Sequence, residues 1–131
     1  MRFGFIGTGN MGGALARAAR RRLAGEDLLL ANRTEAKAAA LAKELGAPLS
    51  NNRTIAGNAD YIFLGVKPQM MGELLAEIGP ELGGRKDRFV LVTMAAGLSI
   101  RDIQDMAGGD YPVLRVMPNT PCSIGEGMIL Y

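Results

Sequence analysis

The segment Arg2-Phe3-Gly4-Phe5-Ile6-Gly7-Thr8-Gly9-Asn10-Met11-Gly12 decides the fold of this chain. It begins with an apolar run that is typical of a buried strand, and residues 11–23 then repeat apolar side chains at helical spacing. Where the strand passes into this helical run, Gly7, Gly9 and Gly12 fit the pattern G-x-G-x-x-G, which allows a tight turn, close approach of backbone to a pyrophosphate, and close helix–strand packing. The segment therefore predicts a dinucleotide-binding turn rather than a merely structural one, because a helix amino terminus favours phosphate.

Strand-like and helical runs alternate along the rest of the chain, as in βαβ units. Thr34 can cap a helix that stops at Gly46, and Ser99 with Asp102 resembles a capping box. Pro68 fits the first turn of another helix. We expect further strands at residues 27–31, 47–49 (short and weak), 61–66, 89–93 and 113–117, the start of one more at 128–130, and helices at 35–45, from 71 to 78 before Pro80, and at 100–106.

This alternation predicts an α/β fold, a Rossmann-type doubly wound and mostly parallel sheet with helices on both faces. The 131 residues, 48% of them hydrophobic, are enough for one domain with a single core, spanning 1–131. In such a fold the ligand crevice lies beyond the carboxyl ends of the strands. Residues that directly follow a predicted strand are therefore the candidates for function.

The segment Asn32-Arg33-Thr34 follows the second predicted strand, where NAD-dependent enzymes place a carboxylate on the ribose hydroxyls. Asn and Thr can donate hydrogen bonds to a 2′-phosphate, and Arg33 adds a permanently charged, bidentate partner. NADP(H) is therefore favoured over NAD(H), which remains possible. Glu35 adds a negative charge that partly offsets the charge of Arg33. The alternative to a phosphate-binding role is that this segment is a polar loop that only caps the next helix.

Three more segments follow predicted strands. Val66-Lys67-Pro68 would bring the Lys67 amine near the crevice, although a solvated lysine explains the spacing equally well. Ala95-Ala96-Gly97 allows close backbone approach to a flat ring, or forms a simple turn. Asn119 and Thr120 lie between two prolines, whose rigidity suits the wall of a site as well as an ordinary loop.

Composition excludes several other classes of function. The chain has no histidine and a single cysteine, Cys122, so we expect no metal site and no intrachain disulfide. The formal net charge of +2 does not suggest a nucleic-acid partner. No apolar run approaches the roughly 20 residues of a membrane span, so we expect a cytoplasmic protein without a membrane partner.

Four motifs, in this order, closely resemble pyrroline-5-carboxylate reductase: residues 4–12, Val66-Lys67-Pro68-Gln69, Ala95-Ala96-Gly97 and Met117-Pro118-Asn119-Thr120-Pro121. The resemblance spans the whole chain, and the last motif is specific to that family and its near relatives. It implies an oxidoreductase that reduces the ring C=N bond of 1-pyrroline-5-carboxylate to L-proline, the last step of proline biosynthesis, with hydride from NADPH or NADH.

The resemblance also implies a role for each candidate residue. The glycine turn would cradle the pyrophosphate, Asn32 to Thr34 with Asn52 would hold the adenosine end, and Asn119 with Thr120 would lie beside the nicotinamide and substrate. Val66, Lys67 and Pro68, together with the small residues after the next strand, would line the path to the nicotinamide. The cofactor-binding set is then Ile6, Gly7, Thr8, Gly9, Asn10, Met11, Gly12, Asn32, Arg33, Thr34, Asn52, Val66, Lys67, Pro68, Ala95, Ala96 and Gly97.

This chain departs from the family in length. The family has a second, helical domain that forms the dimer, completes the pocket for the small-molecule substrate and supplies a hydroxyl near the imine nitrogen. We therefore expect a nucleotide-binding domain clipped at its carboxyl end, inactive on its own, from a parent that is a homo-oligomer through the missing domain. The alternatives are a related NADP-dependent reductase, such as the deazaflavin-dependent or β-hydroxyacid dehydrogenase groups, and a non-catalytic nucleotide-sensing relative.

Overall fold

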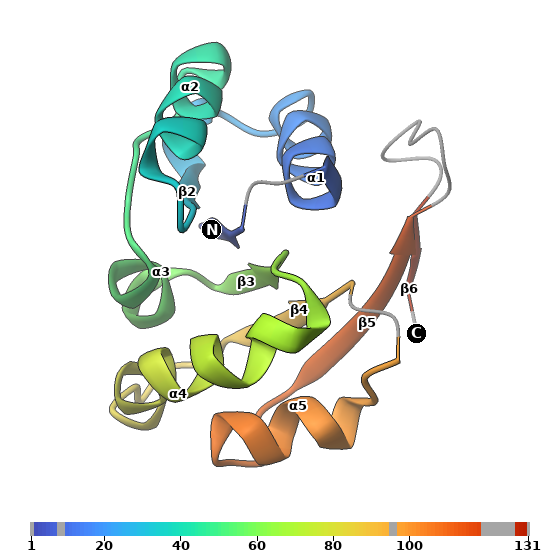
Figure 1. Cartoon of the computed structure of the whole chain (residues 1–131). Coiled ribbons are helices and arrows are strands. Elements are labelled where there is room, and N and C mark those ends of the chain that lie inside the picture. Colours follow the sequence, from blue (N-terminus) through green and yellow to red (C-terminus); the bar gives the residue numbers. More distant parts are fainter. Residues whose placement is uncertain (1, 8–9, 95–96, 119–127, 131) are drawn as a thin grey trace.

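The structure is a computed structural model that describes residues 2–7, 10–94, 97–118 and 128–130. Strands and helices alternate along these residues (Figure 1). In chain order the elements are β1 (Phe3–Ile6), α1 (Asn10–Arg20), the short 3-10 helix η1 (Gly25–Asp27), β2 (Leu28–Ala31), α2 (Glu35–Leu45), α3 (Asn52–Asn58), β3 (Tyr61–Leu64), α4 (Pro68–Gly83), β4 (Val90–Thr93), α5 (Ile100–Ala107), β5 (Val113–Pro118) and β6 (Met128–Leu130).

The strands form one six-stranded sheet in the order β2-β1-β3-β4-β5-β6. Strands β1 to β5 are parallel, and β6 pairs antiparallel with β5, placing Leu130 opposite Val116. Because β1 lies between β2 and β3, the strand order changes direction there. The predicted doubly wound, mostly parallel fold is confirmed.

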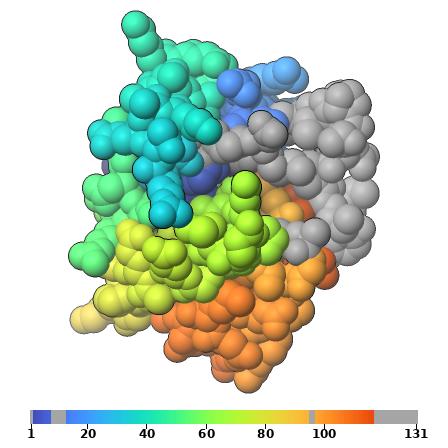
Figure 2. All heavy atoms as spheres, viewed as in Figure 1, coloured from blue at the N-terminus to red at the C-terminus, as the bar shows by residue number. Residues whose placement is uncertain are grey.

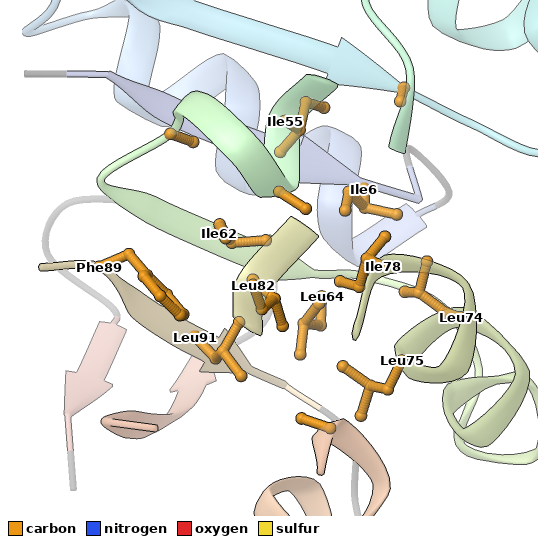
Figure 3. Close-up of a cluster of buried hydrophobic side chains, with 14 of the residues drawn as sticks. Ile6, Ile55, Ile62, Leu64, Leu74, Leu75, Ile78, Leu82, Phe89 and Leu91 are labelled. Carbon is orange, nitrogen blue, oxygen red and sulfur yellow. The ribbon is translucent and has the colours of Figure 1, made fainter. Parts of the chain in front are cut away.

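Helices cover both faces of the sheet, as Figure 1 shows. On one face α1 and α2 pack against β1 and β2 through residues such as Leu15 and Leu41. On the other face α3, α4 and α5 contribute Ile55, Ile78 and Ile103 to the larger core cluster, part of which is drawn in Figure 3. Each fully buried aliphatic side chain of this kind contributes about 1.5–3 kcal/mol relative to an exposed one. The sheet is therefore buried on both faces, which holds its strands between two layers of helices.

Local signals in the sequence explain where several helices begin and end. The capping box is confirmed: the Ser99 hydroxyl accepts from the Asp102 N–H, and the Asp102 carboxylate accepts from the Ser99 N–H. Gly46 ends α2 in the left-handed conformation, as expected. Thr34 occupies the N-cap position of α2, but its side chain makes no capping hydrogen bond.

Residues 47–49 do not form the short strand that the sequence suggested. Only Leu49 bridges to Leu30, where Leu30 N–H donates to Pro48 O and Ser50 N–H donates to Leu30 O. Pro48 has no N–H, so this segment cannot extend the ladder.

Two helical features differ from expectation. The sequence analysis missed α3, whose N-cap Asn51 accepts a hydrogen bond from the Thr54 N–H. The helix α4 does not stop before Pro80 but runs to Gly83, since burial of Leu82 continues the apolar stripe beyond the proline. Pro80 cannot donate to the carbonyl one turn before it, but its own carbonyl accepts from Gly84 N–H at 3.1 Å, which closes the turn that follows the proline.

Candidate functional site

The carboxyl ends of β1, β2 and β3 meet at one edge of the sheet. Ile6, the last residue of β1, pairs with Ala31 on β2 and with Leu64 on β3. The three segments that follow these strands therefore start side by side, although they are far apart in sequence. This is the change in strand order beside which ligands bind in open parallel sheets.

Gly7 makes the turn out of β1. Its φ is 88°, which disfavours any side chain, and its N–H donates to Ala31 O at 2.9 Å. A Cβ at this position would come within 2.8 Å of the Gly65 carbonyl carbon and 2.9 Å of the Val66 nitrogen. The backbones that follow β1 and β3 can therefore approach this closely only because residue 7 is glycine.

The helix α1 begins at Asn10, three positions after Gly7, and its first turn carries no acidic residue. The unpaired N–H groups and the dipole at the start of a helix attract anions. The arrangement of strand, glycine turn and helix start therefore has the polarity that a pyrophosphate needs.

A cavity of about 310 Å³ opens beside this turn. Its lining includes Ile6 and Leu74, which also belong to the hydrophobic core in Figure 3. Figure 2 shows the segment after β2, in cyan, reaching toward the yellow-green start of α4, with dark-blue β1 between them. The other lining residues are Gly7, Asn32, Arg33, Asn52, Val66, Met70, Glu73 and Glu77.

A second cavity of about 490 Å³ adjoins the first, and we call the first the inner cavity and the second the outer cavity. The two cavities share four lining residues, Asn32, Arg33, Asn52 and Glu77, which we call the ridge. The outer cavity also contains Glu35 and the segment 49–52 that leads into α3. An elongated ligand could follow this path from the glycine turn to the start of α3.

Three side-chain contacts span the site. Asn32 Nδ2 donates to Thr34 O at 3.1 Å and so folds the loop after β2. The exposed Arg33 lies across to α4, where its Nη1 contacts Met70 Sδ at 3.7 Å. Asn52 Nδ2 donates to Glu77 Oε1 at 3.4 Å, which joins α3 to α4. The loop after β2 and the helix α3 are thus both tied to one face of α4.

The structure brings together only part of the predicted set. Ile6, Gly7, Asn32, Arg33, Asn52 and Val66 line one cavity. The other described members lie apart from both cavity linings: Thr34 and Lys67 are exposed at helix N-caps, Pro68 is the first residue of α4, and Gly97 is exposed with a φ of 83°.

Other predicted residues are described in part or not at all. Asn10, Met11 and Gly12 form the first turn of α1 by their backbone. Thr8, Gly9, Ala95, Ala96, Asn119 and Thr120 lie outside the described residues.

Sequence reasoning missed the contribution of α4. Met70, Glu73, Leu74 and Glu77 all line the inner cavity. Their spacing of i, i+3, i+4 and i+7 places them on one face of a helix, and they begin soon after a predicted strand end. That spacing was the available signal, but it was overlooked because the strongly apolar residues of the same helix define its core-facing stripe.

The charges around the inner cavity are mixed. Among its lining residues, Arg33 carries the positive charge, whereas Glu73 and Glu77 carry negative charges. Within the described residues, no group of three or more His, Cys, Asp or Glu side chains is placed to hold a metal ion. None of the described helices is both long and apolar enough to cross a membrane.

The chain is similar in sequence to known oxidoreductases. The family described as "NADP oxidoreductase coenzyme F420-dependent" matches residues 2–97. The curated pyrroline-5-carboxylate reductase of Corynebacterium melassecola is 38% identical over 104 residues, which are 79% of this chain and 38% of that protein.

Two solved structures are similar over nearly the whole chain. The pyrroline-5-carboxylate reductase of Coxiella burnetii has a TM-score of 0.83 and 27% identity, covering 92% of this chain and 44% of its own. The Plasmodium falciparum pyrroline carboxylate reductase, solved with NADP bound, has a TM-score of 0.79 and 32% identity, covering 100% of this chain and 47% of its own.

The chain spans less than half the length of the curated relatives it matches. The match to the family covers most of the chain, and both the curated relatives and the similar structures carry the reductase name. The chain therefore belongs to the family described as "NADP oxidoreductase coenzyme F420-dependent", and its resemblance to pyrroline-5-carboxylate reductase is confirmed.

Proposed function

We propose that this chain binds NADP(H) in preference to NAD(H), as the dinucleotide-binding part of a pyrroline-5-carboxylate reductase. The observation that carries the proposal is the position of Arg33 and Asn32 on a cavity that begins at the Gly7 turn. A pyrophosphate at the start of α1 would leave the adenosine half of the dinucleotide in this cavity. The complex of the Plasmodium relative with NADP supports the assignment.

The residues present fit such a ligand. Gly7 keeps the turn free of side-chain atoms, and the start of α1 offers N–H groups to the pyrophosphate. Arg33 is exposed and can form bidentate hydrogen bonds with a 2′-phosphate. The cavity volume of about 310 Å³ falls in the usual range for small-molecule sites, and the adjoining cavity extends it.

In the full-length protein we propose reduction of the C=N bond of 1-pyrroline-5-carboxylate to L-proline. When bound, the reduced dinucleotide supplies the hydride. The contribution of this chain is to fix the position of that donor through the glycine turn and the adenosine cavity. We also propose, in the roles given by the family resemblance, six site residues that lie outside the described part of the structure: Thr8, Gly9, Ala95, Ala96, Asn119 and Thr120.

Because the relatives are more than twice as long as their matched part, we expect this chain alone to bind the dinucleotide without forming proline. We also propose that the rest of the parent protein completes the substrate pocket and forms its homo-oligomer. An assay for proline formation with NADPH and pyrroline carboxylate tests the first statement. Turnover by the isolated chain would contradict it.

Calorimetric titration with NADPH and NADH tests the proposed cofactor. We expect tighter binding of NADPH, and about tenfold weaker NADPH binding after Arg33→Ala, since a charge-assisted hydrogen bond to phosphate is lost. The matched control is Arg21→Ala, which removes an exposed arginine at the far end of α1 from the glycine turn.

Equal affinities for the two dinucleotides would remove the NADP preference. The same loss in the Arg21 variant would show a general charge effect, not a phosphate contact. Absence of binding to either dinucleotide would overturn the proposed function.

A deazaflavin-dependent NADP reductase is the second candidate. The matching family is named for coenzyme F420, and its match ends at residue 97, before the Met117 to Pro121 motif that favours the pyrroline carboxylate enzyme. The parent protein distinguishes the two. Reduction of a deazaflavin by NADPH, without reduction of pyrroline carboxylate, would favour the second candidate.

A further inference from the structure

Glu77 belongs to the ridge, the four residues that line both the inner and the outer cavity. It lies on the same face of α4 as Met70 and Glu73. The exposed guanidinium of Arg33 contacts Met70 at the start of that face. The positive charge of Arg33 and the negative charges of Glu73 and Glu77 therefore lie along the same proposed binding path.

Asn52 connects Glu77 to the adenosine end of the proposed site. Its Nδ2 lies 3.4 Å from Glu77 Oε1. A carboxylate only accepts hydrogen bonds, so Glu77 holds the Asn52 side chain with its amide nitrogen toward α4. A phosphate also only accepts, so a 2′-phosphate at this ridge would seek the same amide nitrogen that Glu77 already engages.

The negative charge of Glu77 should also weaken binding of a 2′-phosphate, as should its competition for the Asn52 amide. A carboxylate and a phosphate repel each other, whereas a ribose 2′-hydroxyl can donate a hydrogen bond to a carboxylate. Glu77 should therefore disfavour NADPH relative to NADH, while Arg33 acts in the opposite direction. Arg33 lies on the loop after β2, whereas Glu77 lies on α4.

We propose that Glu77 is a specificity-determining residue that limits the preference for NADPH over NADH. It does so by holding the Asn52 amide and by placing a negative charge at the site of the 2′-phosphate. This inference rests on the proposed function, since it requires the dinucleotide to bind in this cavity. The opposing charges of Arg33 and Glu77 give a site that accepts both dinucleotides.

The test is the ratio of the dissociation constants for NADH and NADPH, measured by calorimetry on the whole chain. We expect Glu77→Gln to raise this ratio about three- to tenfold, and the gain to shrink as salt screens the repulsion. Glu77→Ala removes the acceptor as well and should raise the ratio in the same direction. Glu77 is exposed on α4, so neither change opens the core.

The control is Glu26→Gln, which makes the same change in net charge. Glu26 is exposed in η1, at the opposite end of β2 from Arg33, and should leave the ratio unchanged. If the Glu77 variants bind both dinucleotides with an unchanged or lower ratio, the inference is overturned and the proposed function stands. If the unmodified chain binds neither dinucleotide, the proposed function and this inference are both overturned.

Discussion

At the scale of single residues, Arg85 shows how a side chain that lines neither cavity holds the helix α3, which carries Asn52. Its side chain is only 4% exposed, and its Nη1 donates to Ala56 O at 3.0 Å and to Ala59 O at 2.6 Å. It also pairs with Asp87 at 2.6 Å and lies 4.7 Å from the centre of the Phe89 ring. Arg85 thus satisfies carbonyls at the end of α3, the helix whose first residue is Asn52.

Replacing Arg85 with methionine should destabilise the fold by about 2–4 kcal/mol. Methionine preserves much of the apolar stem, but the carbonyls of Ala56 and Ala59 lose a charged donor in a largely buried position. Urea unfolding followed by circular dichroism gives the free energy of unfolding. A loss below about 0.5 kcal/mol would show that water replaces the guanidinium there.

Asp87→Asn provides the control, because Asp87 is exposed and accepts from Nε and Nη2 of the same guanidinium, not from the Nη1 that binds the carbonyls. Its effect should be much smaller than that of Arg85→Met. The hydrogen bond from Arg85 lowers the pKa of Asp87 below its usual 3.8 in the folded chain. Its contribution is therefore fully present above pH 3.8 and is lost as the pH falls through the lower folded value, so the two proteins should converge in strong acid.

Residues differ in how far the sequence alone can reveal their roles. Gly7 was predictable because its turn is decided by neighbours in sequence, between a strand and a helix. Glu77 and Arg85 were not, since their partners lie 25 to 29 positions away and meet them only after α3 packs on α4. The predicted adenosine residues Arg33 and Asn52 do line one cavity, but their binding roles remain predictions.

At the scale of elements, the helices α2 and α5 both begin at a hydroxyl residue with extended backbone, but only one of these residues caps its helix. Ser99 and Asp102 form the complete capping box of α5, whereas Thr34 at the N-cap of α2 makes no side-chain bond. Ser99→Ala should therefore cost about 1 kcal/mol of folding free energy, measured by urea unfolding without ligand. Thr34→Ala should change it by only a few tenths of that amount. Equal losses would contradict the distinction between the two caps.

Elements with strong local signals were predictable, and those defined by packing were not. The helix α2 has both an apolar stripe and a glycine stop, which the sequence displays directly. The helix α3 has only seven residues, so its pattern is too short to stand out, although Gly4 on β1 leaves space for its Ile55. Continuation of α4 through Pro80 depends on burial of Leu82, which is a tertiary effect.

At the scale of the whole molecule, the strand topology decides which segments of the chain meet at the candidate site. Alternating strands and helices predicted a parallel doubly wound sheet, and the strand order confirms it. The antiparallel direction of β6 was not predictable, because a short apolar run fits either direction of pairing. What the topology adds is the common edge at which the segments after β1, β2 and β3 meet. A ligand held there touches several elements and should stabilise them together.

Ligand binding should therefore raise the thermal stability of the entire chain. NADPH at about 100 times its dissociation constant should add about 2.7 kcal/mol, which corresponds to a rise in melting temperature of roughly 10 °C. Because the described cavities lie where the adenosine half is proposed to bind, adenosine 2′,5′-bisphosphate should also raise it, and nicotinamide mononucleotide at equal concentration should not. Scanning calorimetry compares the three ligands, with Arg33→Ala as the variant that should lose most of the bisphosphate effect. A larger shift with the mononucleotide would place the main binding energy at the nicotinamide end and contradict the assignment of these cavities to adenosine.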